Sequence, residues 1–398
     1  MRGQPTEFPM PGFWRAKCGV WDRRYELDWL RCLAVLIVFF YHGARLFNAP
    51  YWDIRNTQRS LVVDVVAGFV GLWLVPLFFL AAGAATRFTL DRHSPFDYIR
   101  RRFRRLVVPF IVGVIILSPV QALLLSPRAF DEPYLDFYIR FFSSRLHSAE
   151  WSLAWLFGEF GFHLWFLGFL FVYSVLALPV FALLRNTRTG RSFVDALACR
   201  SSCAWGLLLW AVPLAIVQGA LRAGFPEYCG LADFFFWLLF FIYGYLLYVD
   251  SRILESLVER RRGILAAAAI CFLALTLFRS VGLLAGWQRN PSYSVGFILF
   301  QVLWGIDAWA WLLYILGLGV RFLNFGNAAI RYATEAILPF YVLHQPVIIA
   351  VGAVVLEWNL GLLVKWLALS ALAMALTLAI YEGLVRRTRM ARWAFGMG

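Results

Sequence analysis

Long apolar segments alternate with short polar segments along nearly the whole chain. Each apolar segment has roughly the 20 residues that a helix needs to cross the hydrocarbon core of a bilayer. The segments lie near residues 28–48, 61–86, 106–126, 162–184, 204–221, 230–249, 264–284, 295–320, 332–354 and 362–385. This pattern predicts an all-α, polytopic bundle of about ten transmembrane helices over residues 28–385, between a basic leader (1–27) and a basic tail (386–398).

The distribution of charge predicts how this bundle is oriented. Hydrophobic residues make up 62% of the 398 residues and charged residues only 15%, while the formal net charge is +14. If alternate loops face the cytoplasm, that side carries 26 Lys and Arg side chains and the opposite side carries 9. Cytoplasmic loops are enriched in these residues, so we expect both termini inside, in a multi-pass protein of the inner (cytoplasmic) membrane. Because topology accounts for the positive charge, no nucleic-acid partner is expected.

The first apolar segment, LDWLRCLAVLIVFFYH (residues 27–42), contains ionisable side chains that a lipid-facing helix would not carry. Arg31 and His42 are eleven residues apart, which is about three helical turns and about 16 Å, so they lie on one face. The same face carries Asp28, Val35, Val38 and Arg45. Since ionisable groups are costly against lipid, this face is expected to line the bundle interior or a wet cavity. The alternative is that Asp28 and Arg31 anchor the helix at the interface and His42 is a hydrogen-bonded packing residue.

Two further histidines fall within predicted spans. His163 opens the span near 162–184, and His344 lies about midway along the span near 332–354. A neutral imidazole can take a proton from a hydroxyl near pH 7, which is what a general base in acyl or proton transfer requires. No HExxH-like spacing or carboxylate-rich set accompanies these histidines, and the six cysteines are scattered. We therefore expect neither a metal site nor a disulfide framework.

A dense basic cluster precedes the span near 106–126. Its five arginines are Arg100, Arg101, Arg102, Arg104 and Arg105. Guanidinium groups form paired hydrogen bonds with phosphates, so the cluster could bind a phosphorylated ligand. Contact with anionic membrane lipids is the commoner use of such a run. The presence of Arg31 on the same side favours a ligand, because a phosphorylated donor could bind there and extend its reactive end towards His42.

These motifs together resemble those of the acyltransferase-3 superfamily of integral membrane acyltransferases, and in particular the branch that contains glucan biosynthesis protein C. Arg31 and His42 match the family's Arg-x10-His motif, and segments 163–167 (HLWFL) and 341–346 (YVLHQP) match further motifs. One departure is Ala82, which stands where many members carry a serine. The matches occur in the family's order over essentially the full chain.

The family's Arg-x-x-Arg motif has two possible matches in this sequence. Arg102 and Arg105 fit best, but Pro109 follows Arg105 by four residues instead of the usual three. This departure leaves Arg101 and Arg104 as the alternative pair.

The resemblance implies an enzyme that takes an acyl group from cytosolic acyl-CoA and transfers it to a carbohydrate hydroxyl across the membrane. By that resemblance His42 is the catalytic histidine, and the arginines at 31, 102 and 105 assist donor binding. His344 or His163 could orient His42 or stabilise the oxyanion. We expect direct transfer, since no cysteine or serine is clearly poised as a nucleophile.

Two alternatives remain open from the sequence. The polar face could line a path for protons or small anions in a transporter. The enzyme could instead act on a lipid, a peptidoglycan or a secondary metabolite. The acyl group, of acetyl or succinyl class, and the acceptor are not specified by any motif.

Overall fold

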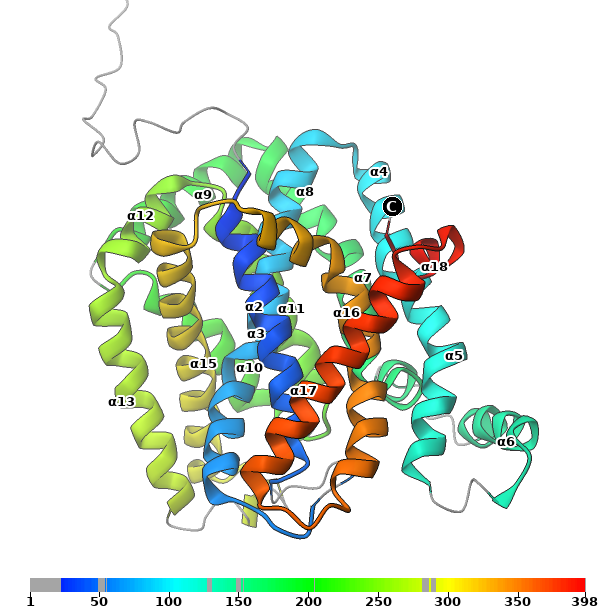
Figure 1. The fold of residues 1–398 in the computed structure, drawn as a ribbon. Coiled ribbons are helices and arrows are strands. Elements are labelled where there is room, and N and C mark those ends of the chain that lie inside the picture. The colour runs from blue at the N-terminus through cyan, green and yellow to red at the C-terminus, as the bar shows by residue number, and fades with distance from the viewer. Residues whose placement is uncertain are drawn as a thin grey trace, which may run out of the picture.

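The computed structural model describes residues 23–48, 54, 56–126, 131–147, 152, 154–203, 205–280, 286–287 and 291–397. Every secondary-structure element among these residues is a helix, which confirms the predicted all-α class. The helices form a bundle in which the start of the first described helix and the C-terminal end lie at the same, upper end (Figure 1). The placement of that end in the cytoplasm stays a prediction.

The helices, in chain order, are α2 (Tyr25–Arg45), α3 (Leu61–Arg92), α4 (Pro95–Arg102), the π-helix η1 (Phe103–Val107), α5 (Val108–Leu125), α6 (Tyr134–His147), the π-helix η3 (Ala154–Glu159), the 3₁₀ turn η4 (Phe162–Leu164), α7 (Trp165–Leu176), α8 (Leu178–Asn186), α9 (Arg188–Ser201), the 3₁₀ turn η5 (Leu208–Trp210), α10 (Ala211–Leu221), α11 (Leu231–Leu247), α12 (Ser251–Glu259), α13 (Arg261–Ser280), α15 (Val295–Phe322), α16 (Ala328–Val355), α17 (Leu362–Ile380), the π-helix η6 (Tyr381–Val385) and α18 (Arg389–Ala394).

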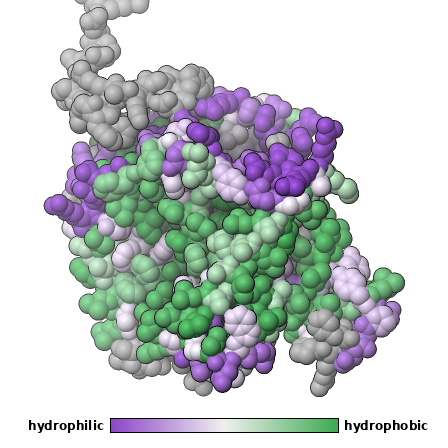
Figure 2. Space-filling view, in the orientation of Figure 1, coloured by the Kyte–Doolittle hydropathy of each residue, from purple (hydrophilic) through white to green (hydrophobic). Residues whose placement is uncertain are grey.

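Eight helical segments in the described part of the chain are long and apolar enough to cross a membrane. They are Tyr25–Arg45, Leu61–Arg92, Pro95–Leu125, Phe162–Asn186, Arg261–Phe278, Val295–Phe322, Ala328–Val355 and Leu362–Val385. Hydrophobic residues cover the middle of the visible face of the bundle, and hydrophilic residues gather at its upper end and, in smaller number, at its lower end (Figure 2). The protein is therefore a multi-pass membrane protein.

The other two predicted spans are helical but shorter than expected. The span near 230–249 becomes α11, which meets α12 at an angle of 102°. Asp250 starts α12 by accepting a hydrogen bond from the Arg252 backbone N–H at 2.9 Å, so a helix cap produces the bend. The span near 204–221 becomes an apolar helix, Leu208–Leu221, which is shorter than the other spans.

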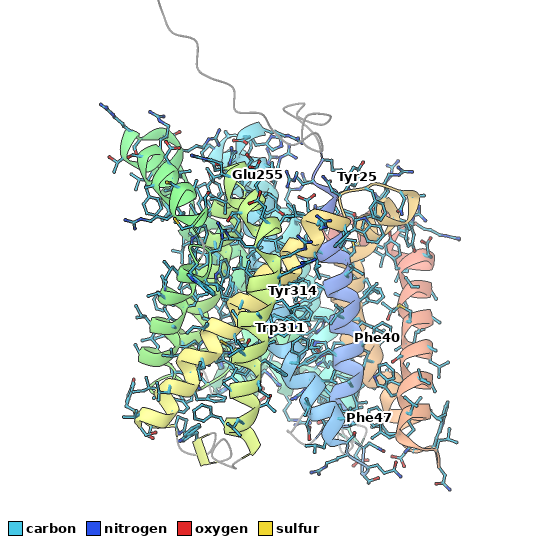
Figure 3. The ribbon with its side chains drawn as sticks, turned by 90° about the vertical axis from the view of Figure 1, so that its left-hand side faces the viewer. Tyr25, Phe40, Phe47, Glu255, Trp311 and Tyr314 are labelled. Carbon is cyan, nitrogen blue, oxygen red and sulfur yellow. The ribbon has the colours of Figure 1, made fainter. Side chains whose placement is uncertain are left out.

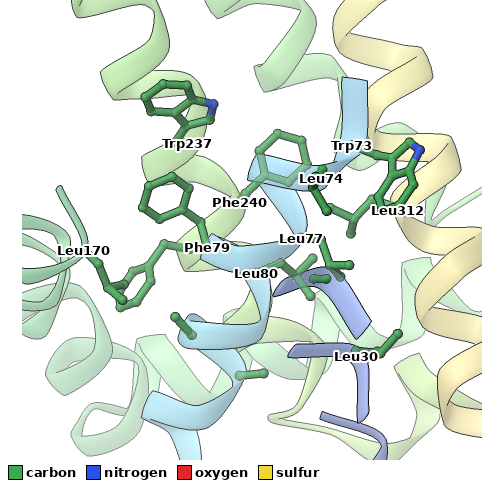
Figure 4. Close-up of a cluster of buried hydrophobic side chains, with 14 of the residues drawn as sticks. Leu30, Trp73, Leu74, Leu77, Phe79, Leu80, Leu170, Trp237, Phe240 and Leu312 are labelled. Carbon is green, nitrogen blue, oxygen red and sulfur yellow. The ribbon is translucent and has the colours of Figure 1, made fainter. Parts of the chain in front are cut away.

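The centre of the bundle depends on a close approach between α3 and α11. Phe79 of α3 stacks on Trp237 of α11, with ring centroids 5.7 Å apart, in the buried cluster (Figure 4). A Cβ added to Gly244 would lie 2.7 Å from the carbonyl carbon of Leu80, which no real side chain tolerates. Small residues allow such backbone contact between helices in lipid, where no hydrophobic effect drives them together.

Helix α2 packs beside this central pair. It runs through most of the thickness of the bundle, with Tyr25 near its upper end and Phe47 just beyond its lower end (Figure 3). Side chains such as Leu27, Leu30 and Phe39 are buried against the core. The helix thus presents residues to the bundle interior at every depth.

Candidate active site

One face of α2 borders two separate cavities. Arg31 and Val35 line a cavity of about 760 Å³, which we call the basic cavity. Val38 and His42, further along the same face, line a cavity of about 460 Å³, which we call the aromatic cavity. The predicted polar face therefore lies against cavities, although not against one continuous groove.

The basic cavity brings Arg31 together with the arginine cluster. Six arginines line it, namely Arg31, Arg100, Arg101, Arg102, Arg104 and Arg105. The Arg31 guanidinium forms an ion pair with Asp28, and its Nε also donates to the Leu27 carbonyl at 3.3 Å. Since Asp28 pairs with one arginine and Asp97 is the carboxylate on the cavity wall, the six arginines still leave the cavity with an excess of positive charge.

Arg102 is held in place by α3. Its Nη2 donates to the Thr86 hydroxyl at 2.9 Å and to the Ala82 carbonyl at 3.2 Å, both on α3. The Thr86 hydroxyl lies 3.0 Å from the hydroxyl of Tyr98, whose ring also lies beneath the Arg102 guanidinium. The backbone of Ala82 thus positions an arginine.

The two alternative arginine pairs differ in their surroundings. The Arg105 guanidinium lies close enough to those of Arg31 and Arg102 for their positive charges to interact, so these three side chains form one positively charged group. Arg101 and Arg104 are exposed, as Arg105 is, and they line the same cavity, whereas Arg102 is half-buried. The cluster is helical throughout, and the π-helical turn η1 contains both Arg104 and Arg105.

The predicted basic tail contributes to the wall of the basic cavity. Trp393 of α18, together with Gly396 and Met397, lines it. Gly396 has a φ of +66°, which favours glycine, and a Cβ there would lie 2.9 Å from the Arg105 carbonyl oxygen. From the sequence, this tail was predicted only to be a basic segment that helps to set the membrane topology.

The three predicted histidines meet beside the aromatic cavity. The ring centroids of His42 and His344 are 5.3 Å apart, and those of His163 and His344 are 5.1 Å apart. His42 and His163 line the cavity, whereas His344 is fully buried behind them. Helices α2, η4 and α16 thus each bring one imidazole to the same place.

Hydrogen bonds fix the tautomers of two of these rings. His344 Nδ1 lies 2.6 Å from the Tyr341 carbonyl oxygen, and His163 Nε2 lies 3.0 Å from the Val342 carbonyl oxygen. Because a carbonyl only accepts, each of these nitrogens carries the proton. The other nitrogen of each ring, Nε2 of His344 and Nδ1 of His163, has no hydrogen-bond partner within the described structure. Each neutral ring therefore offers an unprotonated nitrogen.

The remainder of the aromatic cavity combines aromatic rings with a few polar groups. The polar residues are Gln218, Arg222, Asp233 and Gln301, and the aromatic ones include Trp165, Tyr228, Trp237, Trp287 and Trp304. Arg222 forms a buried ion pair with Asp233 and donates to the Gln218 side-chain oxygen at 3.0 Å. These groups give the cavity fixed donors and acceptors between flat apolar surfaces.

Comparison with known proteins agrees with this geometry. A family model described as "Acyltransferase domain" matches residues 24–382. This chain belongs to the acyltransferase-3 family. It is also similar to "Glucans biosynthesis protein C" of Escherichia coli (strain K12) and of Shigella dysenteriae serotype 1 (strain Sd197). Both relatives are 23% identical over 342 residues, which covers 83% of this chain and 84% of each relative. No solved structure gives a significant match.

Family membership confirms that the protein is a membrane acyltransferase and that the resemblance noted in the sequence is real. Among the described residues of this acyltransferase, no group of three or more His, Cys, Asp and Glu side chains could hold a metal ion.

Two strained residues flank the aromatic cavity of the acyltransferase. Phe162 (φ +46°) immediately precedes His163, and Cys229 (φ +64°) immediately follows Tyr228. Left-handed backbone costs a bulky residue roughly 1–2 kcal/mol, and such strain concentrates at functional sites. The Cys229 backbone N–H donates to Asp233 at 3.0 Å, which helps to hold this turn in place.

Sequence reasoning missed the polar groups of the aromatic cavity. The available signal was Asp233, a carboxylate inside the predicted span near 230–249, because ionisable residues within spans are usually functional. Its partner, Arg222, was counted only as an extramembrane charge. The aromatic residues gave no signal, since tryptophan and tyrosine also concentrate at ordinary membrane interfaces.

Proposed function

We propose that the acyltransferase moves an acyl group of acetyl or succinyl class from cytosolic acyl-CoA to a hydroxyl of an extracytoplasmic carbohydrate. The observation that carries this proposal is the single face of α2 that places Arg31 in the basic cavity and His42 in the aromatic cavity. The donor enters from one side of the membrane and the acceptor from the other. A position in the inner membrane is part of the same proposal.

The basic cavity suits the phosphates of the donor. Arginine binds phosphate in a planar, paired geometry, and six arginines line this cavity. Arg102 is held in place before any ligand binds, which lowers the ordering cost of binding. The thioester end of the donor then extends along α2 towards His42.

In this reaction His42 acts as the general base. It accepts the proton of the acceptor hydroxyl as the hydroxyl oxygen bonds to the thioester carbon. The carbon–sulfur bond then breaks, and the CoA thiolate receives the proton from His42. His344 and His163 act as neighbours that position His42, since they supply unprotonated nitrogens next to it.

The aromatic cavity suits a carbohydrate acceptor. Flat rings such as Trp165 and Trp237 can stack on the apolar face of a sugar ring, while Gln218, Arg222 and Asp233 can hydrogen-bond to its hydroxyls. The names of the relatives refer to the biosynthesis of glucans, which makes a glucan the first acceptor to test.

The direct test uses the purified protein in lipid nanodiscs, with labelled acetyl-CoA or succinyl-CoA and glucan oligosaccharides. The expected result is acceptor-dependent release of CoA thiol and label on the glucan. General-base catalysis contributes about 10²–10⁴-fold, so His42→Ala should lose activity by that factor. His147→Ala is the matched control, because His147 is an exposed histidine of α6 outside both cavities. Undiminished transfer by His42→Ala would remove this histidine from the mechanism.

A further inference from the structure

Three aromatic residues line both cavities: Phe78 of α3, Phe166 of α7 and Tyr341 of α16. Their rings are in contact, with centroids 5.5 Å apart for Phe78 and Phe166 and 5.9 Å apart for Phe166 and Tyr341. We call these three residues the aromatic partition. The aromatic partition lies between the basic cavity, which the arginines line, and the aromatic cavity, which His42 lines.

The members of the aromatic partition are held to different degrees. The Tyr341 hydroxyl donates to the His163 carbonyl, and the Tyr341 carbonyl accepts from His344, so this residue is fixed to the histidine group. Phe78 and Phe166 are half-buried and have no polar atoms on their side chains. Ring packing alone holds them, and they can therefore be displaced at lower cost than Tyr341.

We propose that Phe78 and Phe166 determine the length of the acyl group that the enzyme accepts. The inference rests on the proposed function and specifies the donor. In acyl-CoA the order along the molecule is phosphates, pantetheine, sulfur, carbonyl and then the alkyl chain. If the phosphates bind the arginines and the thioester carbon reaches His42, then the sulfur, the carbonyl and the alkyl chain all pass the partition, and the alkyl chain shares the aromatic cavity with the acceptor. Bulky rings at that point admit a short acyl group and exclude a long one.

Binding measurements test this without requiring catalysis. S-ethyl-, S-butyl- and S-octyl-CoA are thioethers that lack the reactive carbonyl, and their affinities are measured by calorimetry in nanodiscs. The wild type should bind S-octyl-CoA much more weakly than S-ethyl-CoA. Phe166→Ala should raise the ratio of S-octyl to S-ethyl affinity at least about tenfold, a change of about 1.4 kcal/mol. Phe166→Leu, a milder change, should raise it less.

The matched control is Phe171→Ala. Phe171 is also a half-buried phenylalanine of α7, but it contacts Phe103 and lies outside both cavities. Suppose that S-ethyl-CoA binds, but that the affinity depends on chain length in the same way for wild type, Phe166→Ala and Phe171→Ala. The aromatic partition then has no role in selecting the acyl chain, and this inference is wrong while the proposed function stands. If no CoA thioether binds the wild type, the proposed function fails and the inference falls with it.

Discussion

Replacing Gly244 by alanine should destabilise the protein strongly. The new Cβ would lie 2.7 Å from the carbonyl carbon and 2.9 Å from the Cα of Leu80, atoms of the α3 backbone that cannot turn aside. Carbon atoms pack at about 3.5–4.0 Å, so α11 must move away from α3 by roughly 1 Å. The reciprocal contact, at Gly83 against the Phe241 carbonyl, would then be loosened as well. Overpacking typically costs about 1–3 kcal/mol, and a backbone clash at the central helix pair should reach or exceed the top of that range.

Thermal unfolding followed by circular dichroism in detergent measures this cost. Gly263→Ala is the control, because Gly263 lies exposed in α13 with nothing within 4 Å of its added Cβ. Alanine is the better helix former by about 1 kcal/mol, so the control should be neutral or slightly stabilised. Equal unfolding midpoints for Gly244→Ala and Gly263→Ala would show that the two helices do not approach as closely as described.

Two further substitutions probe the two cavities. Thr86→Val keeps the shape of the side chain but removes the hydroxyl that accepts from Arg102, and hydrogen bonds to charged groups contribute about 1.5–3 kcal/mol. It should weaken S-ethyl-CoA binding by about tenfold or more, whereas Thr276→Val in α13 should leave the affinity unchanged; equal affinities would refute the role of Thr86. Arg222→Met should cost about 3–5 kcal/mol in unfolding free energy by leaving the buried Asp233 without its cation. The double variant with Asp233→Asn should recover much of that loss, and an Arg222→Met protein as stable as wild type would refute the importance of the pair.

Hydropathy predicted the helices well, because each span is a local property of about 20 residues. It also predicted which face of α2 is polar, since the helical period places Arg31 and His42 on one side. The predicted span near 230–249 ends close to where α11 ends, but hydropathy gives no angle between successive helices, so the 102° bend before α12 could not be predicted. The length of α10 was likewise overestimated, since hydropathy does not record where a chain leaves the helical conformation.

The meeting of the histidines was only partly predictable. Motif matches selected His42, His163 and His344, but their distances depend on packing between residues as far apart as His163 and Val342, 179 positions along the chain. Phe166 and Tyr341 of the aromatic partition lie in the matched segments 163–167 and 341–346, but no motif indicated that their rings border two cavities. Phe78 and Phe166 are apolar residues in apolar spans, and their position between the cavities is visible only in the structure.

The chain between Arg102 and Pro109 contains a π-helical turn, Phe103–Val107. An α-helix turns by about 100° per residue. One extra residue in a helix would therefore rotate every later side chain by about 100° around the helix axis, unless a wider turn accommodates the extra residue. A π-turn absorbs a residue, and such turns are frequent at functional sites. Arg105 therefore faces the basic cavity while Gly113, further along α5, packs so closely on Leu164 that an added Cβ would overlap that side chain. Because Leu164 follows His163 directly, the register of α5 helps to position the histidine group as well as the arginines.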